Sequence, residues 1–99
     1  MFDYRNESIM RLFQAITSFE NVEECGAFFE DLCTIKELQD MAQRFDAAIL
    51  LSKDYSFQRI SETVGMSTAT ISRVNRCLNY GSGGYKLAIE RLEKQEDEK

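Results

Sequence analysis

The chain has 99 residues, no proline, no histidine, and a formal net charge of −5 at pH 7. This length predicts a single domain over residues 1–99, or one half of an obligate dimer. No apolar run approaches the roughly 18 residues that cross a bilayer, and the start of the chain lacks a signal-peptide pattern, so we expect a cytoplasmic protein with no membrane partner.

The first half of the chain predicts three helices. Between Ile9 and Phe19, apolar side chains recur every three or four residues, which is the spacing of one helix face. Two further helices open on capping boxes, in which a glutamate follows the capping residue by three positions: Asn21 with Glu24, and Thr34 with Glu37. Most of the apolar surface of the stripes along these helices is expected to lie in a hydrophobic core.

The same stripes also suit a dimer interface. They are rich in phenylalanine, with Phe13, Phe28 and Phe45 among their members. A lone chain of this length buries only about 60–65% of its unfolded surface, so pairing with a second copy would add stability. We expect residues 1–52 to supply the N-terminal dimerisation helices of a homodimer.

The second half of the chain predicts a helix-turn-helix over residues 53–79. Ser56 can cap a short helix that ends at Val64, and Ser67 can cap a longer helix after a turn at Gly65. Glycine suits that turn because the backbone there needs a positive φ. The side chains expected in the corner between the two helices are all apolar: Ile60, Val64, Met66, Ile71 and Val74.

Residues 80–99 complete a six-helix, all-α fold with a C-terminal helix and a charged tail. The stretch "YGSGG", residues 80–84, is predicted to end the preceding helix, because glycine adopts the left-handed conformations that stop one. A last helix is expected from Tyr85 onward, and the tail after it is expected to fray.

The cysteines and the missing histidine argue against a metal site and against an enzyme. Cys25, Cys33 and Cys77 are odd in number, lie far apart and form no C-x-x-C pair, which favours buried thiols in a reducing compartment. Without histidine, a zinc site would need carboxylates to complete it, and catalysis would lack the commonest general base. We therefore expect no metal ligands and no catalytic residues.

An excess of basic over acidic side chains is found only in the segment that holds the predicted helix-turn-helix. Residues 1–50 carry four basic and ten acidic side chains, residues 51–92 carry six and three, and residues 93–99 carry two and four. Over a Debye length of about 8–10 Å, the local face rather than the total charge decides the attraction to phosphate. An acidic protein can thus still bind DNA through its middle segment.

The outward face of the second helix in this motif suits a DNA groove. Short hydroxyl side chains and alanine let a helix sit deep in the major groove, and arginine can pair with guanine or clamp a phosphate. We expect Arg73 and Arg76 to dominate affinity, with the neighbouring short side chains helping to select bases. The candidate DNA-binding residues are Gln58, Ser67, Thr68, Ala69, Thr70, Ser72, Arg73 and Arg76.

Two other classes of protein compete with a DNA-binding regulator. Corners of this kind also occur in purely structural helical bundles, and a Ser/Thr-rich helix start can serve only as a cap. The chain could therefore be a helical dimeric protein–protein interaction module without DNA binding, with its acidic first half as the partner surface. An enzyme is disfavoured, because the chain has neither a phosphate-loop glycine pattern nor a convergent pair of carboxylates.

The stretch "STATISRVNRCLNYGSGGYKL", together with "MAQRFDAAILL" before it, resembles the tryptophan-repressor superfamily and most closely its YerC/YecD-type branch. The resemblance covers roughly Thr34 to Leu92. It implies a six-helix fold and an intertwined homodimer that presents two DNA-binding heads about one DNA turn, roughly 34 Å, apart. It also implies a transcriptional regulator, usually a repressor, that binds double-stranded DNA.

The resemblance further implies a candidate effector site at Arg44 and Arg73. In the tryptophan-binding members the indole lies between two arginines, and these are the matching positions, with a one-residue shift at Arg44. A solvated Arg44 paired with Asp40 is the alternative. Val74 stands where the tryptophan-binding members carry a glycine, and it would crowd a flat ring. We therefore expect no cofactor and no tryptophan, and leave any other small effector open.

Overall fold

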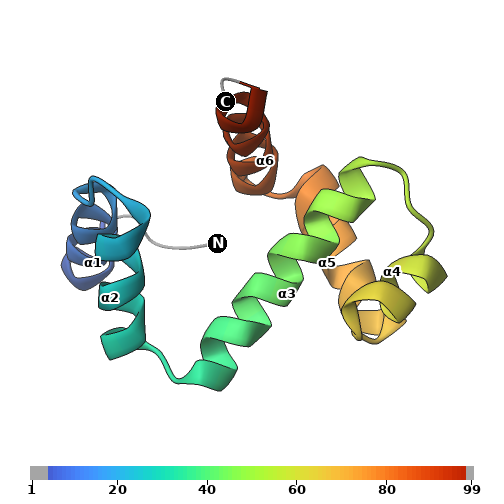
Figure 1. Ribbon diagram of the computed structural model, residues 1–99, viewed down its shortest axis with the longest axis horizontal. Helices are drawn as coiled ribbons and strands as arrows, with labels where there is room; N and C mark the ends of the chain where they lie inside the picture. Colours follow the sequence, from blue (N-terminus) through green and yellow to red (C-terminus); the bar gives the residue numbers. More distant parts are fainter. Residues whose placement is uncertain (1–4, 98–99) are drawn as a thin grey trace. The chain divides into compact units, whose positions relative to one another are not determined.

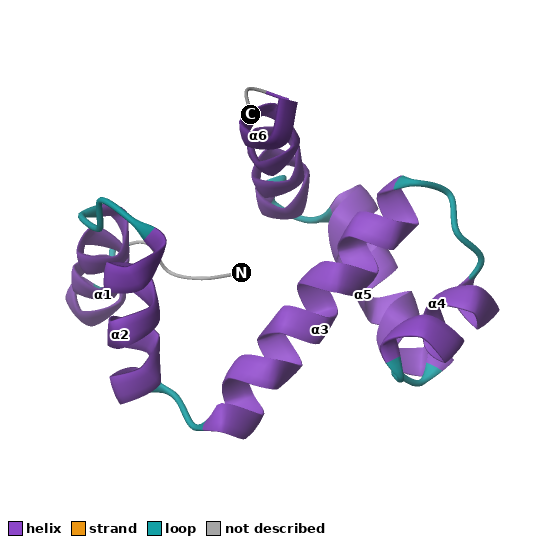
Figure 2. Ribbon diagram, viewed as in Figure 1, coloured by secondary structure: helices purple, strands orange, loops and turns teal. Residues whose placement is uncertain are grey.

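The computed structural model describes residues 5–97, in which all the regular structure is α-helical. None of the helices in this range is both long enough and apolar enough to cross a membrane. Six helices follow one another along the chain (Figures 1 and 2): α1 (Glu7–Thr17), α2 (Val22–Leu32), α3 (Ile35–Ser52), α4 (Phe57–Val64), α5 (Thr68–Tyr80) and α6 (Gly84–Asp97). The predicted all-α, six-helix order is confirmed, with α5 one residue longer than expected. α6 begins one residue earlier than expected and continues to Asp97, so the expectation that the charged tail after Leu92 frays is wrong as far as that residue.

The chain divides into two compact units, residues 1–38 and residues 39–99. The first unit holds α1, α2 and the start of α3, and the second holds the rest of α3 with α4, α5 and α6. The predicted boundary at residue 52 refers to the assembled dimer, and it stays a prediction.

The helices of the first unit begin at side-chain caps. The side chain of Asn21 accepts a hydrogen bond from the Glu24 N–H at 2.9 Å, and the Glu24 carboxylate accepts one from the Glu20 N–H at 3.0 Å. In the expected capping box the Glu24 carboxylate would accept a hydrogen bond from the N–H of Asn21, but it accepts one from the preceding residue, Glu20. At α3 the capping box is reciprocal, and the N–H of Thr34 donates to the carboxylate of Glu37 at 2.9 Å. Hydrogen bonds with Thr34 hold the pKa of Glu37 below its usual value.

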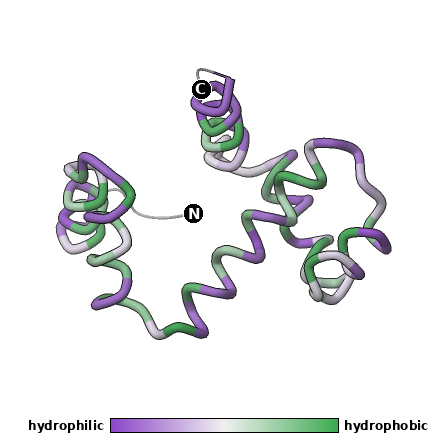
Figure 3. Tube along the Cα trace, viewed as in Figure 1, coloured by the Kyte–Doolittle hydropathy of each residue, from purple (hydrophilic) through white to green (hydrophobic). Residues whose placement is uncertain are grey.

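The apolar stripes of α1 and α2 are not core within one chain. Neither helix has a buried residue, although Phe19 and Phe28 lie with ring centroids 5.3 Å apart and Phe28 meets Phe29 at 5.7 Å. Figure 3 shows hydrophobic and hydrophilic residues alternating along both helices. The expectation that most of this apolar surface is core is thus wrong for α1 and α2 within a single chain, because two helices alone cannot enclose each other's side chains.

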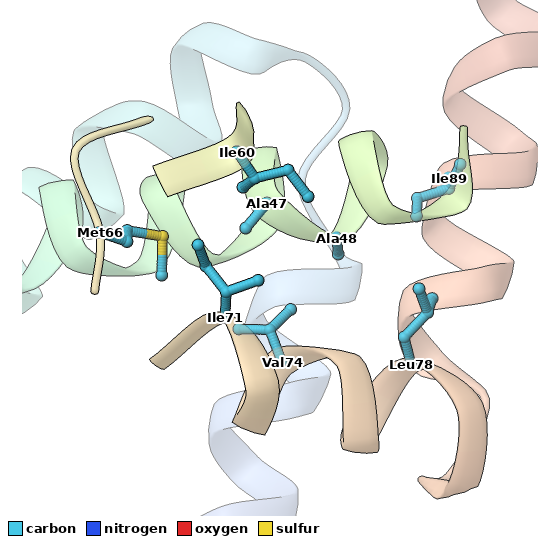
Figure 4. Packing of buried hydrophobic residues seen from close by; sticks show 8 residues of the cluster. All are labelled: Ala47, Ala48, Ile60, Met66, Ile71, Val74, Leu78 and Ile89. Atoms are coloured by element: carbon cyan, nitrogen blue, oxygen red, sulfur yellow. The ribbon is translucent and has the colours of Figure 1, made fainter. Parts of the chain in front are cut away.

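The hydrophobic core lies in the second unit and is built around α5. Ile71, Val74 and Leu78 on one side of α5 pack with residues of the other three helices and of the turn before α5 (Figure 4). α5 contacts both α4 and α6. Ile60 and Ile71 are the largest fully enclosed side chains, and each contributes about 1.5–3 kcal/mol by its burial. The other members of the core are Ala47, Ala48, Met66 and Ile89.

Gly65 allows the sharp turn between α4 and α5. Its φ is 80°, in the left-handed region that side-chain-bearing residues avoid, and its N–H closes α4 by donating to the Ser61 carbonyl at 2.9 Å. No neighbouring atom lies within 4 Å of where a Cβ would stand, so the requirement for glycine comes from backbone conformation rather than from crowding.

Gly65→Ala is expected to destabilise the protein by about 1–2 kcal/mol, because alanine must adopt the strained left-handed conformation. Chemical denaturation monitored by circular dichroism measures the change. Gly84→Ala is the matched control, since Gly84 starts α6 without a positive φ and with open space around it. Equal stability of the two variants would contradict the role given to Gly65.

Candidate nucleic-acid interface

The start of α5 is held by its cap residue. The hydroxyl of Ser67 accepts a hydrogen bond from the Thr70 N–H at 3.2 Å, and the hydroxyl oxygens of Ser67 and Thr70 lie 3.0 Å apart in a second hydrogen bond. The cap residue has an extended backbone and the next residue is helical, as predicted for a cap at this position. The first turn of α5 is thus ordered by its own side chains.

The turn before α5 is tied to α4 by a bond that sequence reasoning missed. The hydroxyl of Ser61, which is half-buried, donates to the carbonyl of Met66 at 2.6 Å. This bond satisfies the carbonyl of a residue in the turn and ties that turn to α4. A small polar residue four positions before the turn glycine was its only trace in the sequence.

The two long sides of α5 differ sharply in exposure. Ile71, Val74 and Leu78 face the core, with 0%, 3% and 7% of their surface exposed. About half a turn away, Ala69, Arg73 and Arg76 share a line of spacing i, i+4, i+7. We call these three residues the outer ridge. All of them are exposed, as are Ser67, Thr68 and Ser72 beside them.

The guanidinium groups of the outer ridge are available to a ligand. Among residues 5–97, neither Arg73 nor Arg76 forms an ion pair or a hydrogen bond through its side chain, and α5 contains no acidic residue. On α6, by contrast, Lys94 pairs with Glu90 at 3.7 Å. The ridge therefore presents two positive charges that no carboxylate of its own helix neutralises.

Two of the predicted DNA-binding residues lie away from the ridge. Gln58 is exposed near the start of α4, where its side-chain amide donates to Glu62 at 3.4 Å. Thr70 is half-buried and turned toward α3. Their predicted contacts with the DNA backbone remain predictions, and the acidic neighbour of Gln58 weakens its case.

The roles of the two candidate effector residues, Arg44 and Arg73, stay predictions. Arg44 is exposed on α3 and lines a hollow of about 300 Å³, and Arg73 is not among the residues of that hollow. Val74, the residue expected to crowd a flat ring, lies in the core with only 3% of its surface exposed. The remaining residues that line the hollow are Asp40, Gln43, Gly65, Met66 and Thr70.

Sequence reasoning also missed a cation–π contact at the start of α4. The guanidinium of Arg59 on α4 lies over the ring of Tyr55, 4.7 Å from its centroid. Such a cation–π contact fixes the loop between α3 and α4 against the start of α4. Aromatic and basic residues four apart were the sequence signal for it.

These features define a helix-turn-helix protein: two helices joined by a glycine turn, a packed inner side, and a basic, hydroxyl-lined outer side. Similarity to known proteins supports the same class. The sequence matches the family described as "Trp repressor protein" over residues 7–93. It is 46% identical over 94 residues to the uncharacterized protein YerC of Bacillus subtilis (strain 168), a match that covers 95% of this chain and 90% of YerC.

Two solved structures share the fold. A TrpR-like protein from Eubacterium eligens ATCC 27750 superposes with a TM-score of 0.86 at 47% identity, covering 91% of this chain and 93% of that one. A candidate Trp repressor from Staphylococcus aureus gives a TM-score of 0.85 at 38% identity, covering 94% and 96%. The chain belongs to the Trp repressor family, as its sequence predicted. This is a family of non-enzymatic regulators, and it implies a helix-turn-helix that binds DNA.

Ser67→Ala is expected to destabilise the protein by about 1 kcal/mol, because the first amides of α5 lose their acceptor. Ser72→Ala removes a hydroxyl from the middle of the same helix and is expected to be neutral or slightly stabilising. Thermal denaturation of the two variants makes the comparison. If both shift the melting temperature alike, Ser67 does not cap the helix in solution.

Proposed function

We propose that this chain is a sequence-specific DNA-binding transcriptional regulator, a repressor, that places α5 of each copy of a homodimer in the major groove. The observation that carries the proposal is the outer ridge of α5: two arginines with no ion-pair partner among the described residues, flanked by short side chains, on the side opposite a rigid core. Family membership supports the same reading.

The division of labour on α5 follows from side-chain size. Ser67 caps α5, and Thr68, Ala69 and Ser72 lie in its first two turns. All four are short and exposed, so the backbone of this part of the helix can approach base edges closely. The long side chains of Arg73 and Arg76, further along α5, can reach guanine or the phosphates that flank the groove. Base selection is thus assigned to the short side chains at the start of α5 and most of the affinity to its arginines.

The homodimer is supported by the apolar surface of the first unit. Val22 is 82% exposed, Leu32 51% and Ile35 77%, although all three are large aliphatic residues. Surface of this kind, next to phenylalanines that no second layer covers, suits burial against another copy. In such a dimer the two copies of α5 would meet successive major grooves of a near-palindromic site, about 10 base pairs apart.

Purified protein is expected to select near-palindromic duplexes whose half-sites lie one helical turn apart. For such a duplex, the double variant Arg73→Ala/Arg76→Ala should bind at least tenfold more weakly and flatten the plot of log K against log salt by about 1–2 per DNA-binding head, since each lost phosphate contact removes about 0.9 from the slope. Fluorescence anisotropy at several salt concentrations measures both quantities.

Arg91→Ala serves as the matched control, because Arg91 is an exposed arginine on α6, away from the outer ridge. Its affinity and salt slope should match those of the wild type. A double variant that binds like the wild type would remove the ridge from the interface. Failure of the wild type to bind any genomic duplex would instead favour an interaction module that kept the corner only as architecture.

Leu32→Asp is expected to convert the dimer to monomers, because a carboxylate would be buried without a partner at the interface between copies. The single chain already exposes this side chain, so each monomer should keep its helical content. Ala27→Asp adds the same charge to the far side of α2 and should leave the mass unchanged. Light scattering coupled to gel filtration measures the mass of each variant. A dimeric Leu32→Asp variant would exclude this surface from the interface between copies.

A further inference from the structure

Tyr80 extends the outer ridge of α5 by one more turn. It follows Arg76 by four residues and Arg73 by seven, so the three side chains lie along one side of the helix, with Ala69 at the other end. Tyr80 is 87% exposed, the highest value among the large apolar and aromatic side chains that are exposed within residues 5–97. Its ring contributes nothing to the core of its own chain.

The backbone holds Tyr80 in this position. Tyr80 is the last residue of α5, and the N–H of Gly81 closes the helix by donating to the Cys77 carbonyl at 2.9 Å. A Cβ on Gly81 would collide with that same carbonyl oxygen, so this close approach requires glycine. Gly83 then turns the chain away with a φ of 86°. The end of α5 is thereby fixed and left uncovered by the segment that follows it.

The length of the ridge brings Tyr80 to the edge of a DNA groove. From Ala69 to Tyr80 the helix rises about 16 Å, at roughly 1.5 Å per residue. The major groove is about 12 Å wide, so a helix whose first turns meet the bases carries its last turn to a phosphate strand. A phenol there suits a phosphate contact, because its uncharged hydroxyl can donate a hydrogen bond to a phosphate oxygen.

The geometry points to Tyr80 as a further DNA-binding residue, one that donates a hydrogen bond from its hydroxyl to a backbone phosphate at the wall of the major groove. The inference rests on the proposed function. It names a neutral contact that complements the charged contacts of Arg73 and Arg76. α5 has no acidic residue, so no carboxylate of this helix adds to the repulsion of a phosphate by the negative end of the helix dipole.

The variant Tyr80→Phe separates the hydroxyl from the ring. Bound to a duplex selected by the wild type, it should show three- to tenfold lower affinity for each DNA-binding head at fixed salt, the size expected for one hydrogen bond lost per head. Its salt slope should equal that of the wild type, because a neutral donor releases no counterion, whereas Arg76→Ala should flatten the slope. Arg91→Ala, an exposed change on α6 rather than on α5, is the control and should bind normally.

Light scattering and thermal denaturation of Tyr80→Phe and Tyr80→Ala complete the test. Wild-type mass and stability with weakened DNA binding would support the contact. Full affinity of Tyr80→Phe would overturn it, as would a loss of dimer mass in Tyr80→Ala, which would place the ring between copies. Absence of DNA binding by the wild type itself would overturn the proposed function, whereas the other adverse outcomes leave that function standing.

Discussion

The orientation of α5 depends on the contact between this helix and two alanines of α3. Ala47 and Ala48 are completely buried, and their small side chains leave room for Ile71 and Val74 to reach the α3 surface. Because interiors are packed as densely as organic crystals, this contact leaves α5 little freedom to rotate about its axis. The orientation of the outer ridge toward solvent follows directly from the burial of the opposite side.

The two units of the chain solve the burial problem in different ways. The second unit encloses a core drawn from four helices, and its turn and helix starts are tied by side-chain hydrogen bonds at Ser61 and Ser67. The first unit has ordered helices but encloses nothing. This difference fits the proposed homodimer, in which each copy would complete its own DNA-binding head and the N-terminal helices would be completed by a partner copy.

Charge follows the same division. The acidic residues gather in the first half of the chain, and the helix-turn-helix segment has an excess of basic ones. Since screening limits electrostatic reach to about 8–10 Å at physiological salt, the charges nearest α5 weigh most in its attraction to phosphate.

The local features of the fold could be read from the amino-acid sequence, because each depends on residues within one or two helical turns. The six helices, the caps at Asn21 and Ser67 and the left-handed Gly65 are of this kind. Periodicity marks a side of a helix as apolar, but it does not say what covers that side. Only the tertiary structure decided that α1 and α2 enclose no core in one chain, that Thr70 is half-buried, and that Tyr80 is left uncovered, since each outcome depends on which helices meet in space.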